Sequence, residues 1–390
     1  IYMGMVPEAA ITMLACARIG AIHSVIFGGF AAEAVRDRVN DAGARLIVTQ
    51  DGAWRRGKVV PLKENVDRAL VHCPSVEHTL VLRRTNNPIE MKADRDVEWS
   101  DAVAGASDTC DAVPVAAEHP LFILYTSGTT GKPKGVLLSQ ANVMAGVEYV
   151  MRAFEMRAEH RTLCVMPLFH TNGLMFSTLP FLLAGATIVM RRRFSATQFW
   201  TQCRETRVNS TSVSPTILAM LLEHEAGAPP AADIMLDFIK VASAPTPVEL
   251  AQRFEKRFGK GLLLETYGLT ETTAINVMNP LRGPRKHGSI GRALAPQEAR
   301  VADDDGKPLP QGSIGEIEIR GPTLMKEYFR DPENTRRAMR DGWLRTGDLG
   351  RIDADGFIFI VGRSKEMILR GGENISPLEI EEVVVKHPAV

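Results

Sequence analysis

This chain of 390 residues contains few cysteines and carries no formal net charge. Its five cysteines are odd in number and scattered, without a Cys-x-x-Cys pair. This distribution argues against a disulfide framework or a zinc site and favours small buried thiols in a reducing, cytoplasmic compartment. Lysine plus arginine equals aspartate plus glutamate at 46 each, so the charge balance gives no support to nucleic-acid or anionic-membrane binding. The cysteines are Cys16, Cys73, Cys110, Cys164 and Cys203.

Long apolar runs are also missing, since none reaches the ~20 residues that a membrane-spanning helix needs. The longest, residues 176–190, contains Pro180 and Gly185 and predicts a helix followed by a strand. We therefore expect no transmembrane segment, and no signal-peptide pattern is present. The chain starts at Ile1 inside a predicted strand and stops at Val390 just after a helical pattern. Both ends are those expected of a fragment.

Helical and extended patterns alternate along most of the chain. Residues 8–20 predict a helix that ends at Gly20, and residues 44–49 predict a strand. The same alternation runs from residue 195 to residue 259. It argues for an α/β protein with layered sheets. Residues 86–114 are polar and irregular and predict a loop-rich excursion on the surface.

One segment, residues 125–136, has the composition of a loop that wraps a phosphate group. It follows the apolar run 121–125, which predicts a buried strand. Its glycines let backbone N–H groups approach an anion, its hydroxyls donate hydrogen bonds, and Lys132 and Lys134 supply positive charge. Its first two glycines lie too close together for the P-loop Gly-x-x-x-x-Gly-Lys-Ser/Thr, and a proline follows the first lysine. An ordinary surface loop is the alternative, which this composition after a buried strand argues against.

The segment 125–136 resembles the phosphate loop of the adenylate-forming superfamily, which contains acyl-CoA synthetases, peptide-synthetase adenylation domains and luciferases. The resemblance implies that the loop binds the phosphates of ATP and that Lys134 takes part in catalysis. The residues of this region assigned to ATP are Thr126, Ser127, Gly128, Thr129, Thr130, Gly131 and Lys132.

Residues 262–272 form a second motif, in which a buried strand delivers polar side chains to one end of the sheet. Open α/β folds bind their ligands at that end. By resemblance, Tyr267 stacks on adenine, Thr270 bonds the α-phosphate and Glu271 holds Mg²⁺. Thr270 and Glu271 are both catalytic by the same resemblance. A hard carboxylate oxygen suits Mg²⁺. A purely structural Thr-Glu turn is the alternative, which the presence of both motifs argues against.

Further positions complete the nucleotide site that the resemblance implies. Asp348 lies in a predicted tight turn, Thr-Gly-Asp, by a hairpin expected over residues 343–361. By resemblance it holds both ribose hydroxyls, because a carboxylate accepts two donors. Arg363 reaches the ribose or a phosphate. The residues that border the adenine, at the end of another predicted strand, are Ser243, Ala244 and Pro245.

Two positions belong to the acyl pocket by resemblance. His170 follows a predicted strand over residues 162–166, and a satisfied core histidine is the alternative. Peptide-synthetase adenylation domains usually carry an aspartate here, so His170 argues against an amino-acid substrate. Gly268 stands where acetyl-CoA synthetases carry a tryptophan that closes the pocket around a small acid. The glycine therefore predicts a substrate larger than acetate.

The first seventy or so residues resemble acetyl- and propionyl-CoA synthetases, through Pro7 to Ala10, residues 14–20 and the Phe-Gly-Gly turn. From about Thr129 onward the resemblance moves toward medium-chain, long-chain or aryl acyl-CoA ligases, which predicts a mosaic. In the first branch, the turn and two basic residues contact the nucleotide end of CoA, although a basic surface turn is the alternative. Two further glycines resemble the loop that lines the pantetheine tunnel. The CoA residues so assigned are Phe27, Gly28, Gly29, Arg55, Lys58, Gly371 and Gly372.

The resemblance implies a large multi-layer adenylating domain over residues 1–361, with mixed sheets and a small β-barrel-like part. Residues 362–390 would then be the hinge and the start of a small α+β C-terminal domain, with Lys365 as the pivot. In the superfamily a lysine further along contacts ATP and the acid, and no residue of this sequence takes that role.

The implied reaction has two steps. A carboxylic acid attacks the α-phosphate of Mg·ATP to give an acyl-adenylate and pyrophosphate, and the thiolate of CoA then takes the acyl group and releases AMP. ATP, Mg²⁺, CoA and the acid are therefore the expected ligands. Two alternatives remain: an adenylating enzyme that loads the phosphopantetheine of a carrier protein, and a nucleotide-binding fragment with little turnover.

Overall fold

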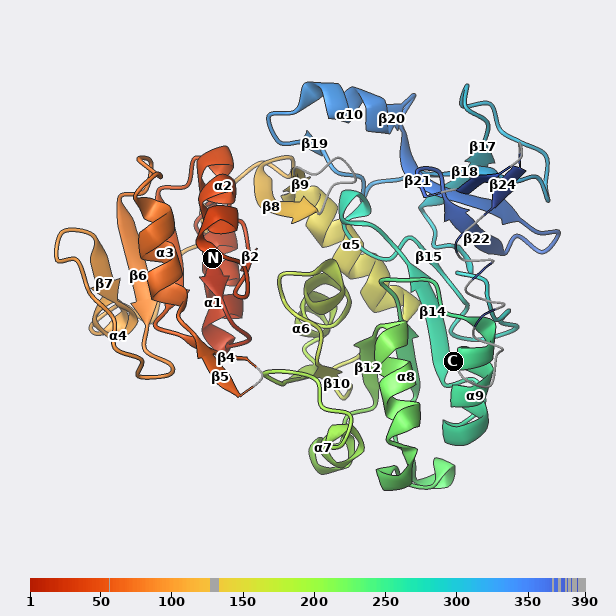
Figure 1. Ribbon diagram of the computed structural model, residues 1–390, viewed down its shortest axis with the longest axis horizontal. Helices are drawn as coiled ribbons and strands as arrows, with labels where there is room; N and C mark the ends of the chain where they lie inside the picture. Colours follow the sequence, from red (N-terminus) through yellow and green to blue (C-terminus); the bar gives the residue numbers. More distant parts are fainter. Residues whose placement is uncertain are drawn as a thin grey trace. The chain divides into compact units, whose positions relative to one another are not determined.

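The computed structural model describes residues 1–55, 57–126, 133–366, 368–370 and 373–375, with the single residues 377, 380 and 384. The chain forms two units, residues 1–140 and 141–390. Helices and strands alternate as expected, which confirms the α/β class (Figure 1). The expected boundary between residues 361 and 362 stays a prediction.

The first unit contains a sheet of five strands whose neighbours all run parallel. Its core is made by Tyr2 from the sheet, Val35 from one helix, and Leu62 and Val66 from another. The strands, in spatial order, are β2 (Ile26–Phe27), β1 (Tyr2–Met3), β3 (Leu46–Gln50), β6 (His78–Leu82) and β7 (Asp96–Glu98). The helices are α1 (Pro7–Arg18), α2 (Ala32–Ala42), α3 (Leu62–Leu70) and α4 (Trp99–Val103).

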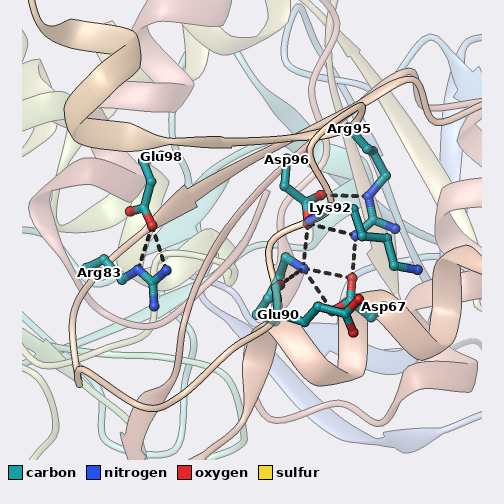
Figure 2. A network of polar contacts seen from close by, with 8 residues as sticks. Asp67, Arg83, Glu90, Lys92, Arg95, Asp96 and Glu98 are labelled. Carbon is teal, nitrogen blue, oxygen red and sulfur yellow. Dashed lines mark hydrogen bonds and ion pairs between the residues drawn. The ribbon is translucent and has the colours of Figure 1, made fainter.

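The loop-rich excursion predicted over residues 86–114 is partly wrong, because β7 and α4 lie within it. Strand β7 pairs in parallel with β6, although its own sequence is polar. Of its three residues only Asp96 is buried, and ion pairs account for the burial of this carboxylate. Asp96 of β7 contacts Lys63 and Arg95, so its charge is compensated inside the fold. Figure 2 shows the contact with Arg95.

Two hairpins complete the first unit. One joins β4 (Ala53–Arg55) to β5 (Lys58–Val60), and the other joins β8 (Pro120–Thr126) to β9 (Lys134–Ser139). The predicted buried strand before the phosphate loop is thus confirmed as β8. Thr126 and Lys134 are directly paired, so the two strands hold both ends of the segment between them.

The second unit is built on a seven-stranded sheet with five parallel strands and two antiparallel ones. Because the carboxyl ends of parallel strands meet at one edge, the segments after them lie where α/β folds bind ligands. The strands, in spatial order, are β11 (Thr187–Met190), β10 (Arg161–Cys164), β12 (Ser210–Val213), β13 (Phe238–Val241), β14 (Leu263–Tyr267), β15 (Val277–Met278) and β16 (Arg292–Ala293).

Helices cover this sheet with large apolar side chains. Trp200, Phe254 and Phe258 pack into one core with the parallel strands. The helices are α5 (Gln140–Ala153), α6 (Leu179–Leu183), α7 (Phe199–Thr206), α8 (Pro215–Glu223) and α9 (Val248–Phe258). The short helical turns are a π-helix (Asn172–Phe176) and three 3-10 turns, Glu225–Gly227, Ala231–Asp233 and Thr270–Thr272.

A second, antiparallel sheet of five strands follows in the same unit. The strand predicted over residues 315–320 and the hairpin predicted over 343–361 are both confirmed. The strands are β17 (Glu298–Ala302), β18 (Gly315–Arg320), β21 (Trp343–Ile352), β20 (Met339–Arg340) and β22 (Ile358–Arg363). The remaining elements are β19 (Glu327–Tyr328), α10 (Pro332–Ala338), and the pair β23 (Ile368–Arg370) and β24 (Glu373–Ile375).

All five cysteines carry free thiols, as expected. Cys73, Cys164 and Cys203 are buried, but Cys110 is exposed, so the expectation of burial is wrong there. Over the described ranges, no helix is both long and apolar enough to cross a membrane.

Candidate functional site

Asp348 is the centre of a hydrogen-bonded cluster that joins the two sheets of the second unit. The Tyr267 hydroxyl, at the end of β14, donates to Asp348 Oδ2 at 2.6 Å. Arg363 Nε, at the end of β22, donates to Asp348 Oδ1 at 2.9 Å. The fold therefore brings together three residues that the sequence assigned to ATP from distant positions.

The prediction that Asp348 lies in a tight turn is wrong. Thr346, Gly347 and Asp348 lie inside β21, which pairs with β18 on one side and β22 on the other. The register shifts along both pairings, and Gly347 has φ 76°. A residue that tolerates positive φ permits such a bulge, and the bulge re-aims the neighbouring side chain.

Tyr267 is only 8% exposed and packs with Val277, Ile317, Ile319 and Ile358. Burial, and then the neighbouring Asp348 carboxylate, raise the pKa of Tyr267 well above its ordinary value. The hydroxyl is therefore protonated and donates to the carboxylate. Because most of the ring is covered by the protein, stacking of adenine on Tyr267 stays a prediction.

The Thr270–Thr272 turn carries the predicted phosphate and metal residues directly after β14. Thr270 Oγ1 lies 3.5 Å from Thr171 Oγ1, and Glu271 is partly exposed. No group of three or more His, Cys, Asp or Glu side chains that suits a metal ion occurs in the described part of the chain. Mg²⁺ usually binds through one or two carboxylates together with substrate phosphates, so the hard oxygens of Glu271 fit this ion.

His170 and the π-helix follow the end of β10. The His170 ring lies 4.6 Å from the Phe169 ring. Although the His170 side chain is exposed, desolvation by its neighbours lowers its pKa below the ordinary value. Single π-helical turns are frequent at functional sites. Placement in the acyl pocket stays a prediction.

Asn172, which the sequence analysis missed, ties three strand ends together. It is 4% exposed, its Nδ2 donates to Ser243 Oγ at 3.2 Å, and its Oδ1 accepts from Ser212 Oγ at 2.5 Å. Ser243 has φ 79°, a conformation that is uncommon outside glycine. Ser243, Ala244 and Pro245 are all exposed after β13. The only sequence signal was an amide side chain soon after a predicted strand.

The surroundings of Gly268 correct the expectation that this glycine simply leaves space in the acyl pocket. A Cβ atom here would lie 2.1 Å from the carbonyl oxygen of Ala274 and 3.2 Å from the Cα of Ile275. The glycine is therefore required by a close approach of backbone to backbone, and does not simply leave space where a side chain would fit. No side chain at position 268 can wall the pocket unless residues 274–275 move.

Lys240 of β13 is a second residue that the sequence analysis missed. It is fully buried, donates to the Phe176 carbonyl at 2.5 Å, and lies 5.2 Å and 5.0 Å from the Phe154 and Phe181 ring centroids. Burial lowers its pKa to about 7, against an ordinary 10.5. The bond to Phe176 holds the end of the π-helix that begins at Asn172.

We expect Lys240 to make stability depend on pH. Between pH about 7 and about 10.5 the unfolded lysine binds a proton that the folded lysine has lost, so the free energy of unfolding rises with pH. The rise is at most about 1.4 kcal/mol per pH unit, and Lys240→Met removes it. Burial raises the pKa of Cys164 to about 11 in the folded protein, and this thiol is present in both proteins, so the difference between their pH profiles reports on Lys240. Urea unfolding of both proteins at pH 7 and pH 9 measures the effect. Parallel pH profiles would contradict it.

The predicted CoA residues form a separate cluster in the first unit. The Arg55 guanidinium lies 4.9 Å from the Phe27 ring centroid. A Cβ on Gly29 would lie 2.2 Å from Arg55 Nη1 and 2.7 Å from the Phe27 ring, so only glycine permits this stack. Arg55 and Lys58 are exposed and directly opposed on the β4–β5 hairpin. Like charges in that arrangement are destabilising, which is consistent with an anionic ligand. Gly28 packs against the Met3 carbonyl.

Of the remaining predicted residues, three lie in the described part of the chain and the others lie outside it. Thr126 and Lys134 are placed at the paired ends of β8 and β9. Lys365 is exposed just beyond β22. The predicted residues outside the described residues are Ser127, Gly128, Thr129, Thr130, Gly131, Lys132, Gly371 and Gly372.

Comparison with known proteins identifies the family. A family model described as AMP-binding enzyme matches residues 1–329. The chain belongs to the AMP-binding enzyme family. A sulfoacetate–CoA ligase from Cupriavidus necator is 46% identical over 279 residues, 71% of this chain and 54% of the relative. An acetyl-coenzyme A synthetase from Rhodopirellula baltica is 37% identical over 414 residues, which cover all of this chain and 60% of the relative.

The sequence similarity to acetyl-coenzyme A synthetases therefore extends over all 390 residues of this chain. It is not confined to the part before the phosphate loop. The chain spans about half to three fifths of the length of these two relatives. ATP-bound MatB from Rhodopseudomonas palustris superposes with a TM-score of 0.87 at 28% identity, over 99% of this chain and 72% of that one. Anthranilate CoA ligase AuaEII, in complex with anthranoyl-AMP, has a TM-score of 0.89 over all of this chain and 72% of its own at 23% identity, which shows the same fold. The adenylate-forming fold expected from the sequence is confirmed.

Proposed function

We propose that the protein is an AMP-forming acyl-CoA ligase. It joins a carboxylic acid to the α-phosphate of ATP, releases pyrophosphate, and then transfers the acyl group to the thiol of CoA and releases AMP. The observation that carries the proposal is the cluster of Tyr267, Asp348 and Arg363, since the Thr270–Glu271 turn follows Tyr267 directly at the carboxyl edge of the parallel sheet.

The side chains of this cluster suit the parts of a nucleotide. The Asp348 carboxylate accepts from the ribose hydroxyls, and Arg363 and Tyr267 hold it in place. The Thr270 hydroxyl donates to an oxygen of the α-phosphate. When bound, Mg²⁺ neutralises phosphate charge, and Glu271 supplies an oxygen to hold it. Chemistry of this kind depends on position and charge, so it needs no nucleophile from the protein.

Free CoA is our preferred acceptor over the phosphopantetheine of a carrier protein. The nucleotide end of CoA distinguishes the two, because it carries an adenine and phosphates. Arg55 and Lys58 offer two exposed cations beside the Phe27 ring and the small Gly28–Gly29 turn. These are suitable contacts for a phosphate and a base.

We propose an acid larger than acetate. Gly268 contributes no side chain to the pocket, and the close backbone contact with Ala274 excludes a tryptophan wall at that position. The lowered pKa of His170 keeps its imidazole neutral near pH 7, so it would act as a hydrogen-bonding group and not as a cation. One relative is named for sulfoacetate and another for acetyl-CoA, so both acids belong in the test.

The test is acid-dependent exchange of labelled pyrophosphate into ATP, followed by CoA-dependent release of AMP. Acetate, sulfoacetate, propionate, benzoate and a long-chain fatty acid are compared, with omission of acid and addition of EDTA as controls. We expect exchange with at least one acid larger than acetate, and AMP release with CoA but not with a carrier protein. ATP binding without exchange for any acid would favour the nucleotide-binding alternative. Exchange with acetate alone would contradict the substrate proposal.

A further inference from the structure

The turn that carries Thr270 and Glu271 is fastened to a second segment, residues 321–328, which follows β18. Thr273 Oγ1 donates to the Thr323 carbonyl at 2.7 Å, and Asn276 Nδ2 donates to Thr323 Oγ1 at 2.9 Å. All of these groups are buried. The segment 321–328, here called the strap, therefore has fixed contacts with the turn.

The strap also contacts Glu271 directly, at both its backbone and its side chain. The backbone N–H of Met325 donates to the Glu271 carbonyl at 2.7 Å. The Tyr328 hydroxyl donates to Glu271 Oε1 at 2.8 Å. Only 4% of Tyr328 is exposed, and its backbone N–H donates at 2.9 Å to Oγ1 of Thr335, which lies within α10. The burial of Tyr328 and the bond from its backbone to Thr335 thus fix the position from which its hydroxyl contacts the carboxylate.

The chemistry of the two groups fixes the direction of this hydrogen bond. An ionised carboxylate can only accept, so the phenol hydroxyl is the donor and occupies one lone pair of Oε1. The remaining lone pairs of the carboxylate stay available for a cation. A hydrogen bond to a metal-binding carboxylate fixes its orientation and strengthens metal binding.

We infer that Tyr328 is a positioning residue that holds Glu271 in the orientation needed to bind the divalent cation delivered with ATP. This inference rests on the proposed function of the same site. Without the phenol hydroxyl, the Glu271 carboxylate samples several rotamers. Cation binding must then order the side chain, and this entropy cost weakens the affinity for the cation. The effect belongs to the affinity for the metal and not to the maximal rate.

The test compares wild type, Tyr328→Phe and a control, Tyr149→Phe. In the described part of the chain the Tyr149 hydroxyl has no hydrogen-bond partner, so its loss removes no contact with Glu271. Binding of Mn²⁺ to each protein with ATP is followed by electron paramagnetic resonance, and exchange is measured across a Mg²⁺ titration. We expect Tyr328→Phe to raise both half-saturating concentrations about tenfold. Its kcat at saturating Mg²⁺ and the titrations of Tyr149→Phe should match wild type.

The outcomes separate the inference from the function on which it rests. Wild type that binds no cation with ATP would overturn the proposed function. Cation binding in wild type that is unchanged in Tyr328→Phe would overturn the inference, because phenylalanine keeps the packing and removes only the hydroxyl. If Tyr328→Phe fails to fold, Thr335→Val carries the same comparison, since it removes the acceptor that holds the backbone of Tyr328.

Discussion

Replacing Lys63 by methionine is expected to lower the free energy of unfolding of the first unit by about 3–5 kcal/mol. Lys63 Nζ is fully buried and contacts Asp67 and Asp96 at 2.8 Å each and the Glu90 carbonyl at 3.0 Å. Figure 2 shows Asp67, Glu90, Arg95 and Asp96 gathered in this network. The Asp96 side chain is also fully buried, so loss of the lysine leaves a charge without one of its two cations inside the protein.

Native-state hydrogen exchange at the amides of α3 and β7 measures this loss, because local opening free energies are read there directly. Arg83→Gln is the matched control. The Arg83–Glu98 pair involves the same strand β7, but its side chains are 38% and 25% exposed. Breaking such a pair costs about 1 kcal/mol or less. Equal effects of the two substitutions would contradict the role assigned to the buried network.

Asp348→Asn is expected to lower kcat/KM for ATP by about 10²- to 10⁴-fold. The carboxylate would accept from both ribose hydroxyls, and a hydrogen bond to a charged group contributes about 1.5–3 kcal/mol. Two such bonds correspond to about 3–6 kcal/mol of transition-state stabilisation. Asparagine keeps the shape and leaves Tyr267 an acceptor, so the loss reflects the charge. Steady-state exchange over a range of ATP concentrations measures it.

Asp355→Asn is the control for this substitution. Asp355 is an exposed carboxylate at the turn of the same hairpin, where it pairs with Lys286 at 2.6 Å. Its loss should leave the ATP kinetics within about twofold, as is usual for surface changes. Tyr267→Phe separates the contributions further, because it removes the donor and keeps the carboxylate. Asp348→Asn with wild-type kinetics for ATP would remove Asp348 from the ribose site.

Local patterns were sufficient for most elements of the fold. The alternation of helices and strands, the strand over 315–320 and the hairpin over 343–361 follow from periodicity and turn residues, which act over a few positions. Strand β7 was missed because its buried residue, Asp96, is a carboxylate whose charge is compensated only when Lys63 and Arg95 reach it. A one-dimensional pattern carries no sign of such a partner.

The candidate site divides in the same way. Residues inside motifs, such as Tyr267 and Glu271, could be predicted because the motif itself is contiguous, and their roles stay predictions. Two other residues were missed, because Tyr328 is 57 residues from Glu271, which it bonds, and Lys240 is 64 residues from the Phe176 carbonyl, which it bonds. Gly268 shows a different limit of prediction from sequence. The sequence shows that position 268 is a glycine, but only the fold shows that the backbone of Ala274 lies too close for any side chain there.

The pairing of Thr126 with Lys134 has a practical consequence for protein engineering. Opposed residues of antiparallel strands lie about 4.5–5.5 Å apart at their Cα atoms. The segment between them therefore enters and leaves the sheet at almost one point, as an exchangeable cassette does. Because this pairing fixes both anchors, we expect segments of different length or composition from other family members to be accepted between them with β8 and β9 in place. The sequence between the two strands can therefore change independently of the strands themselves.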